Sequence, residues 1–133
     1  MSILVFCETM QRILLAEDEK SIQELYQKVL ENAGFCVDTA DDGEEALEKT
    51  AAQSYDLVLL DIIMPKKDGL SVLKELRSAE ESGPRRKIVM LTVLTADECL
   101  NTAMSAGADD YLDKTNLTPG QVVERVKALL AAG

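Results

Sequence analysis

Short apolar runs alternate along the chain with longer stretches in which apolar residues recur at helical spacing. The runs span residues 13–16, 36–39, 57–60, 88–91 and, more weakly, 111–112. They are rich in aliphatic and β-branched residues and are too short for helices, so each predicts a buried strand. Strands that alternate with helices are typical of a parallel sheet covered by helices.

Between these runs, apolar residues recur at the spacing of one helix face. The first such set is Ile22, Leu25, Tyr26, Val29 and Leu30. Gly34 follows this set and ends the predicted helix. Later helices are expected over residues 44–52, 70–76, 96–106 and 119–130. The last of them has Thr118 as its N-cap and Pro119 at its first helical position.

The order of these elements predicts an α/β fold. Five strands and five helices within 133 residues fit a doubly wound, flavodoxin-like (βα)5 domain, with a five-stranded parallel sheet in the strand order 2-1-3-4-5. We expect this domain over residues 12–133, preceded by an N-terminal extension of unknown role at residues 1–11. Ligands of such domains bind beyond the carboxyl ends of strands 1 and 3, so functional residues are expected there.

The charge balance narrows the classes of partner. The chain carries 24 acidic and 14 basic side chains, a formal net charge of −10, and has no cluster of Lys and Arg. Such a surface repels phosphate backbones and anionic lipids. We therefore expect no nucleic-acid or membrane contact through this chain, and output through protein contacts instead.

Cysteine and histidine usage adds to these exclusions. The three cysteines, Cys7, Cys36 and Cys99, are widely spaced and form no CxxC motif, so we expect them to be reduced, as in a cytoplasmic protein. The chain has no histidine, which excludes an imidazole base and the usual zinc sites. The apolar run at residues 3–7 lacks a basic leader and is too short to cross a bilayer, so it predicts no secretion signal.

Acidic residues gather where ligands are expected. Glu17, Asp18 and Glu19 follow the first predicted strand, and Asp61 follows the third. Taken alone, each is an ordinary solvated acid at a strand end, helix start or turn. The predicted strand order brings them to one rim, however, where carboxylates repel one another unless a cation neutralises them. Oxygen ligands without His or Cys favour a hard ion, Mg²⁺ above all.

Two further polar residues lie at the ends of the remaining strands. Thr92 ends the fourth strand and Lys114 follows the fifth. Each has an ordinary alternative role, because Thr is common in strands and a surface Lys is usually solvated. Together with a metal and a carboxylate nucleophile, a hydroxyl and an ammonium complete the set of groups that can receive a phosphoryl group.

These residues occur in four ordered segments, ILLAEDE, DLVLLDIIMPKKDGL, IVMLT and AGADDYLDK. In this order and spacing the segments resemble the receiver domain of two-component response regulators, and the resemblance covers nearly the whole chain. It implies that Asp61 is the phospho-acceptor. It also implies that Asp18 and Asp61 bind Mg²⁺ directly together with the backbone carbonyl of Ile63, while Glu17 acts largely through a bound water.

The resemblance assigns the remaining residues to the phosphoryl group and to a switch. Lys114 would pair with a phosphate oxygen, and Thr92 would turn inward to donate a hydrogen bond to the phosphoryl group. The ring of Tyr111 would then occupy the space behind Thr92. Gly69 would let the chain turn close to the site and begin the third helix.

The implied function is phosphoryl transfer to Asp61 from the phosphohistidine of a sensor histidine kinase or phosphotransfer protein, or from a small phosphodonor. A conformational switch would follow, and a downstream protein partner would read it. The domain would promote only its own phosphorylation and dephosphorylation, so we do not expect an enzyme acting on other substrates. We expect a cytoplasmic protein that is a monomer or dimerises on phosphorylation.

Some positions depart from the family pattern. Val93 is larger than the usual residue after the switch threonine, and Ile63 and Leu94 are apolar where the family tunes water access. The apolar Ile63 and Leu94 suggest a long-lived phosphoryl state. Val93, together with Thr115 after the predicted fifth strand, favours one alternative, a pseudo-receiver that keeps the fold as a protein-interaction module without phosphorylation, whereas retention of every charged site residue argues against it. A haloacid-dehalogenase-type phosphatase is excluded, because that class needs an acid at position 63.

The segment after Lys114 also departs from the family. Thr115 stands where the family has a proline that supports a cis bond, and Asn116 and Leu117 resemble a loop one residue longer than usual. We expect a trans bond before Thr115, because a cis bond costs about 2.5–4 kcal/mol at a non-proline residue. The longer loop would keep Lys114 near Asp61 and let Leu117 cover the core.

Overall fold

The computed structural model describes residues 10–79, 86–92 and 97–132. Most of the predicted N-terminal extension lies outside the described residues, as do Val93 and Leu94. Over the described ranges, strands and helices alternate as the hydrophobic pattern predicts.

The strands form a single parallel sheet. They are β1 (Arg12–Ala16), β2 (Cys36–Ala40), β3 (Leu57–Leu60), β4 (Lys87–Thr92) and β5 (Asp110–Asp113). The strand order is β2-β1-β3-β4-β5, and all neighbouring strands are parallel. Each strand contains the predicted run and exceeds it by no more than one residue at either end. The predicted fold class and strand order are confirmed.

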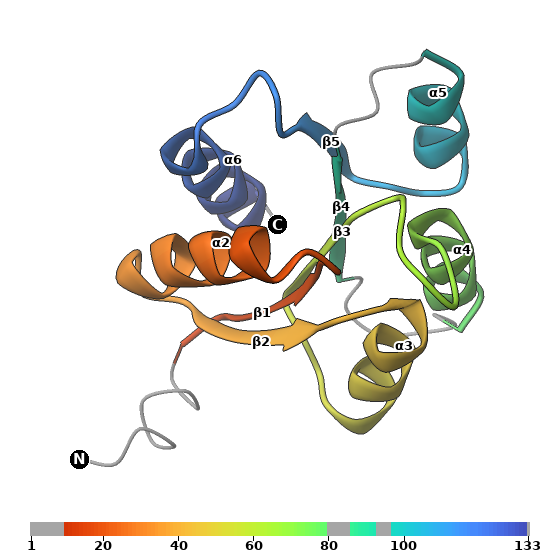
Figure 1. Cartoon of the computed structure of the whole chain (residues 1–133), viewed down its shortest axis with the longest axis horizontal. Coiled ribbons are helices and arrows are strands. Elements are labelled where there is room, and N and C mark those ends of the chain that lie inside the picture. The colour runs from red at the N-terminus through yellow and green to blue at the C-terminus, as the bar shows by residue number, and fades with distance from the viewer. Residues whose placement is uncertain (1–9, 80–85, 93–96, 133) are drawn as a thin grey trace.

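The helices cover both faces of the sheet. They are α2 (Lys20–Asn32), α3 (Gly43–Ala52), α4 (Gly69–Ala79), α5 (Asp97–Ser105) and α6 (Pro119–Ala132). Figure 1 shows α2 and α6 together on one face and α3, α4 and α5 on the other. No helix in the described ranges has both the length and the apolar character that a bilayer span requires.

The sheet separates two hydrophobic cores, because successive side chains of a strand point to opposite faces. Leu14 packs in the core beneath α3, α4 and α5, whereas its neighbour Leu15 packs in the core beneath α2 and α6. Every side chain of β3 is fully buried. Burial of one Leu contributes about 1.5–3 kcal/mol, so the continuous apolar runs hold the central strands in a fixed register.

Local signals in the sequence fix where the helices begin and end. Gly34 follows α2 with a φ of 102°, a conformation that glycine adopts without steric cost. The hydroxyl of Thr118 accepts a hydrogen bond from the amide of Gln121 at 3.2 Å, while the Gln121 side chain accepts one from the Thr118 amide at 2.9 Å. This reciprocal pair confirms Thr118 as the N-cap of α6.

One expectation drawn from composition is wrong. Cys36, the first residue of β2, is disulfide-bonded rather than reduced. An odd number of widely spaced cysteines still allows one pair, because separation along the chain does not determine separation in the fold.

Candidate functional site

The register of β1 and β3 places acidic residues at one rim of the sheet. Ala16 pairs with Leu60, so Glu17 and Asp61 are the next residues of the two strands. The amide of Asp61 donates to the carbonyl of Ala16 at 3.1 Å, and the amide of Glu17 donates to the carbonyl of Ala40 at 3.0 Å. Backbone hydrogen bonds therefore fix the points from which both carboxylates project.

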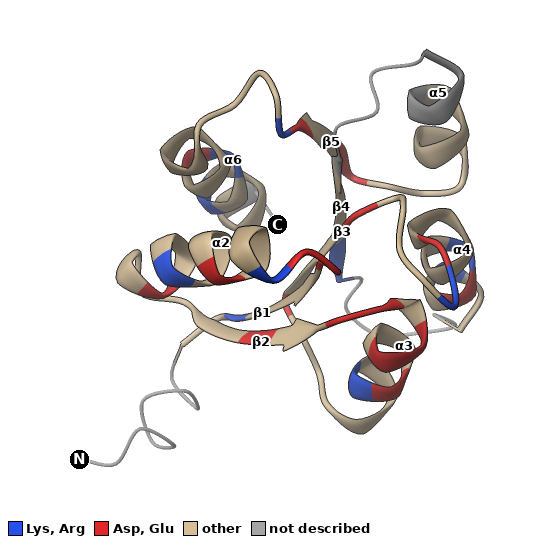
Figure 2. Ribbon diagram, in the orientation of Figure 1, with Lys and Arg blue, Asp and Glu red and all other residues tan. Residues whose placement is uncertain are grey.

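Glu17, Asp18 and Asp61 form an acidic cluster. Each contributes one carboxylate oxygen, and these oxygens lie within 4.8 Å of one another. Glu17 is 3% exposed and Asp61 is 9% exposed, whereas Asp18 faces solvent. Figure 2 shows acidic residues in the connection between β1 and α2, at the carboxyl edge of the sheet. The cluster thus has a buried side formed by two acids and an open side at Asp18.

Lys114 joins the cluster from the carboxyl end of β5, an outer strand of the sheet. It follows β5, and its ammonium donates to both carboxylate oxygens of Glu17, at 2.9 and 2.8 Å, and to Asp61 Oδ2 at 3.0 Å. The Lys114 side chain is only 7% exposed. The buried ammonium therefore bridges the two buried acids. Removing one partner of such a buried pair lowers the stability of a protein strongly.

One ammonium does not balance the negative charge of the cluster. Burial, together with the neighbouring Asp61 carboxylate and against the effect of Lys114, raises the pKa of Glu17 to about 8. Burial alone would lower the pKa of Lys114, but its hydrogen bonds and charge interactions with Glu17 and Asp61 outweigh this effect and the pKa is raised. The raised pKa of Glu17 thus reflects mainly its burial, and the raised pKa of Lys114 reflects the two carboxylates around it.

A divalent cation fits this arrangement. The ligand atoms on offer are carboxylate oxygens, the donors that hard cations such as Mg²⁺ prefer. A second cation beside Asp18 would favour the ionised form of Glu17, whose pKa is raised by burial and by the neighbouring Asp61. Within the part of the chain that the structure describes, Glu17, Asp18 and Asp61 are therefore the group that could hold Mg²⁺.

The connection after β3 wraps closely around Asp61. The amide of Ile63 donates to Asp61 Oδ1 at 3.2 Å, and the amide of Gly69 donates to the carbonyl of Ile62 at 2.8 Å. A Cβ at Gly69 would lie 2.1 Å from the carbonyl oxygen of Asp61, so only glycine fits there. The side chain of Asp68 caps α4 through the amide of Ser71 at 2.8 Å.

A second glycine holds this connection from the side of α3. A Cβ at Gly43 would lie 2.0 Å from the carbonyl oxygen of Lys67. Next to it, Lys66 has a φ of 68°, and its ammonium lies 3.6 Å from Asp42 Oδ2. The first turn of α3 therefore packs directly on the backbone that leads away from Asp61.

The connection after β5 is organised by a carboxylate instead of a proline. Asp113 accepts hydrogen bonds at Oδ1 from the amide and the hydroxyl of Thr115, at 2.8 and 2.6 Å, and at Oδ2 from Asn116 at 2.9 Å. No peptide bond between described residues is cis, so the bond between Lys114 and Thr115 is trans, as expected. Leu117 packs against the core beneath α2 and α6, also as expected.

The predicted switch residues lie on β4 and β5. Thr92 ends β4 and pairs in register with Asp113, but its side chain lies outside the description. Tyr111 is partly buried and packs against the core beneath α3, α4 and α5. The structure thus brings Glu17, Asp18, Asp61 and Lys114 together, with Ile63 bonded to Asp61.

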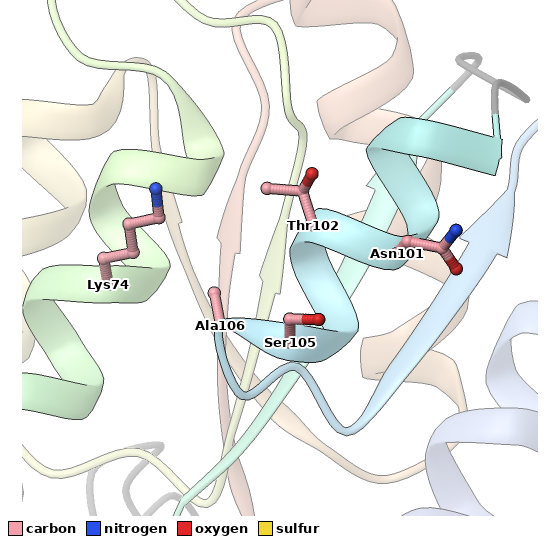
Figure 3. Close-up of a pocket in the computed structure, with 5 residues that line it drawn as sticks. All are labelled: Lys74, Asn101, Thr102, Ser105 and Ala106. Atoms are coloured by element: carbon pink, nitrogen blue, oxygen red, sulfur yellow. The ribbon is translucent and has the colours of Figure 1, made fainter.

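A hollow of about 420 Å³ lies away from this site, between α4 and α5 (Figure 3). Its lining residues are Lys74, Asn101, Thr102, Ser105 and Ala106. None of them is a carboxylate, and all belong to helices or their ends rather than to strand ends. The hollow is therefore separate from the acidic cluster.

The sequence of the whole domain agrees with this geometry. Residues 13–127 match the response regulator receiver domain. The chain therefore belongs to the receiver domain family of two-component response regulators.

Individual relatives share this family. The chain is 42% identical over 120 residues to the alkaline phosphatase synthesis transcriptional regulatory protein PhoP of Bacillus subtilis, an alignment that covers 90% of this chain and 48% of PhoP. It is 38% identical over 121 residues to the transcriptional regulatory protein CpxR of Escherichia coli, covering 91% of this chain and 50% of CpxR. The chain spans about half the length of the curated relatives it matches.

Solved receiver structures superpose closely. The receiver domain of the Francisella response regulator 1452 matches with a TM-score of 0.84 and 30% identity, covering 92% of this chain and 98% of that one. The response regulator TrrA of Thermotoga maritima, solved in complex with Mg²⁺ and beryllofluoride, matches with a TM-score of 0.79 and 39% identity, covering 90% and 99%.

Two residues that shape the site were not found by sequence reasoning. Gly43 and Gln23 both act through contacts with backbone from distant segments. The only local signal for Gln23 is its place among apolar residues on the inner face of α2, where a polar side chain needs a partner. Gly43 directly follows the N-cap of α3, a position that gives no hint of a tight contact.

Proposed function

We propose that this receiver domain accepts a phosphoryl group on Asp61 in a Mg²⁺-dependent reaction and passes the signal on through a change of shape. The observation that carries the proposal is the shared ammonium of Lys114, which hydrogen-bonds Asp61 and Glu17 beside a third acid, Asp18. Phosphoryl transfer depends on positioning and on stabilising charge over the phosphoryl oxygens, and this arrangement supplies both.

In the proposed step, one carboxylate oxygen of Asp61 attacks the phosphorus of a phosphohistidine on a partner protein. A P–O bond forms while the P–N bond breaks, and the imidazole leaves with the bonding electron pair. The chain has no histidine of its own, so the donor is another protein or a small phosphodonor. We propose a sensor histidine kinase or phosphotransfer protein as the donor, which places the domain in the cytoplasm.

The chain's own residues orient the acceptor. The amide of Ile63 and the ammonium of Lys114 each bond one carboxylate oxygen of Asp61, so the carboxylate plane is fixed before a donor arrives. Mg²⁺ held by Asp18 and Asp61, with the carbonyl of Ile63 and with Glu17 through water, would neutralise charge on the phosphoryl oxygens. Lys114 would give up one of its hydrogen bonds to Glu17 and donate to a phosphoryl oxygen instead.

The output is proposed to pass through β4 and β5 to a protein partner. Thr92 would bond the phosphoryl group and Tyr111 would pack behind it, changing the face formed by α5, β5 and α6. The domain would modify only itself, as a monomer or a phosphorylation-dependent dimer. PhoP and CpxR are named transcriptional regulators, which supports a downstream partner in gene regulation.

Phosphate-affinity gel electrophoresis after treatment with acetyl phosphate tests the proposal. We expect a Mg²⁺-dependent mobility shift for the wild-type protein and none for Asp61→Asn. Asp68→Asn is the matched control, because it changes an exposed acid of the same connection to another good helix cap. Labelling of Asp61→Asn at the wild-type rate would refute the assignment, and an unlabelled wild-type protein would favour the pseudo-receiver.

A further inference from the structure

Gln23 is a buried polar residue beside the acidic cluster. It lies in the first turn of α2 and is 3% exposed, on the same inner face as Tyr26 and Leu30. A side-chain amide at such a position costs free energy unless its donors and acceptor are hydrogen-bonded. The hydrogen bonds of the Gln23 side chain therefore indicate which groups stabilise this buried amide.

The Gln23 amide nitrogen faces three acceptors. It donates to the carbonyl of Glu17 at 2.9 Å and to Asp41 Oδ1 at 2.9 Å, with a longer contact to the carbonyl of Ala40 at 3.3 Å. Asp41 belongs to the connection after β2, and hydrogen bonds from Lys20 and then Gln23 lower its pKa. The amide thus links the ends of β1 and β2 from the side of α2.

The Gln23 side chain is one of the groups that hold the segment carrying the metal-site acids. The amide of Glu17 is bonded to Ala40, the carbonyl of Glu17 is bonded by the Gln23 side chain, and the carbonyl of Glu19 is bonded by the Gln23 backbone at 2.9 Å. Glu19 is the N-cap of α2 but makes no side-chain capping bond. The Gln23 side chain therefore fixes the carbonyl of Glu17 next to a helix start that has no side-chain cap.

We propose that Gln23 is a positioning residue of the metal site, whose buried side-chain amide sets the backbone from which the Glu17 and Asp18 carboxylates project. This inference rests on the proposed Mg²⁺ function of the acidic cluster. Residues that orient metal ligands by hydrogen bonding are worth about 10–100-fold in metal affinity in known sites. A role in folding alone would leave the affinity of the folded protein unchanged.

Substitution of Gln23→Met keeps the size and shape of the side chain and removes its donors. A Mg²⁺ titration followed by backbone amide NMR signals, at a temperature where the variant is folded, should give a dissociation constant about tenfold higher than wild type. In metal-free buffer the amide signals of Asp18 and Glu19 should also shift. Gln27→Met, the same change one turn further along α2, should alter neither measurement.

The outcomes separate the two proposals. If Gln23→Met lowers the unfolding temperature but binds Mg²⁺ with wild-type affinity, Gln23 is structural only and the inference is wrong, while the proposed function stands. If the wild-type protein binds no Mg²⁺, the proposed function fails and this inference fails with it.

The wild-type protein offers a readout that needs no variant. The side-chain amide protons of Gln23 should exchange slowly with solvent, because they are buried and bonded, and their signals should move when Mg²⁺ is added. Fast exchange without a response to Mg²⁺ would overturn the inference even if Gln23→Met did not fold.

Discussion

At the scale of single residues, the site is governed by a conflict between burial and charge. Glu17 and Asp61 are both largely buried, and Lys114 is the ammonium that hydrogen-bonds them. The raised pKa of Glu17, about 8, means that the folded protein holds a proton there over a pH range in which the unfolded chain is ionised. A cation bound beside these acids should therefore stabilise the domain most at alkaline pH.

The burial of the Glu17 carboxyl predicts that the free energy of unfolding of the domain depends on pH. In metal-free buffer, the free energy of unfolding should fall as the pH rises from 5 to about 8, because the folded state binds more protons than the unfolded state in this window. Glu17→Gln should flatten this dependence. Urea unfolding followed by circular dichroism at several pH values measures it.

Two comparisons control this prediction. Glu19→Gln removes the same charge from an exposed neighbour and should keep the wild-type slope. Saturating Mg²⁺ should abolish the fall in the wild-type protein, because the cation stabilises the ionised cluster. An identical slope in wild type and Glu17→Gln would contradict the prediction.

At the scale of elements, two connections position the site, and each depends on a few close contacts. The connection after β3 is packed between Gly69 and Gly43, and the connection after β5 is built around Asp113. Neither relies on regular secondary structure, so a small change can displace the acceptor or the ammonium without altering the sheet.

Gly43→Ala should destabilise the domain and slow phosphorylation. The new Cβ would lie 2.0 Å from the carbonyl oxygen of Lys67, so α3 or the connection that leads away from Asp61 must move. Gly120→Ala in α6 is the matched control, since a Cβ there meets its nearest atom at 3.9 Å. The control should be neutral or stabilising by up to about 1 kcal/mol. Unfolding and labelling rates of both variants are compared, and equal behaviour would argue against a tight contact.

Thr115→Pro should also impair the domain, despite the proline that the family has at this position. Proline removes the amide and the hydroxyl that both bond Asp113 Oδ1, which should cost about 1–3 kcal/mol of stability and shift Lys114. Thr115→Ser keeps both donors and should match wild type. Urea unfolding and acetyl phosphate labelling test the pair, and a fully stable, active Thr115→Pro would disprove the account of this loop.

At the scale of the whole molecule, the fold was predictable because short apolar runs mark the strands, most clearly in β1, β3 and β4, and apolar residues at helical spacing mark the helices. The positions of Glu17, Asp18 and Asp61 followed from the ends of the first and third strands and from the strand order. Contacts between backbone and distant side chains were not predictable, as Gln23, Gly43 and the disulfide of Cys36 illustrate. Such contacts join residues that are distant in the sequence and close in the fold, so no periodic pattern in a single sequence indicates them.

The proposed switch should involve a whole face of the domain. Beryllofluoride with Mg²⁺ mimics the phosphoryl group, and we expect it to shift NMR signals across α5, β5 and α6 as well as at the site. Asp61→Asn should show no such change. Shifts confined to the residues around Asp61 would argue against the switch and for the pseudo-receiver.

The ion pair between Lys114 and Glu17 joins residues 97 positions apart. During synthesis on a ribosome, the first strand and its acids emerge long before the lysine that completes their partner set. A nascent or prematurely terminated chain that stops short of position 114 holds the carboxylates without their ammonium. Under the proposed function, such an incomplete chain would lack a competent acceptor, and only a domain made and folded through its fifth strand would be phosphorylated.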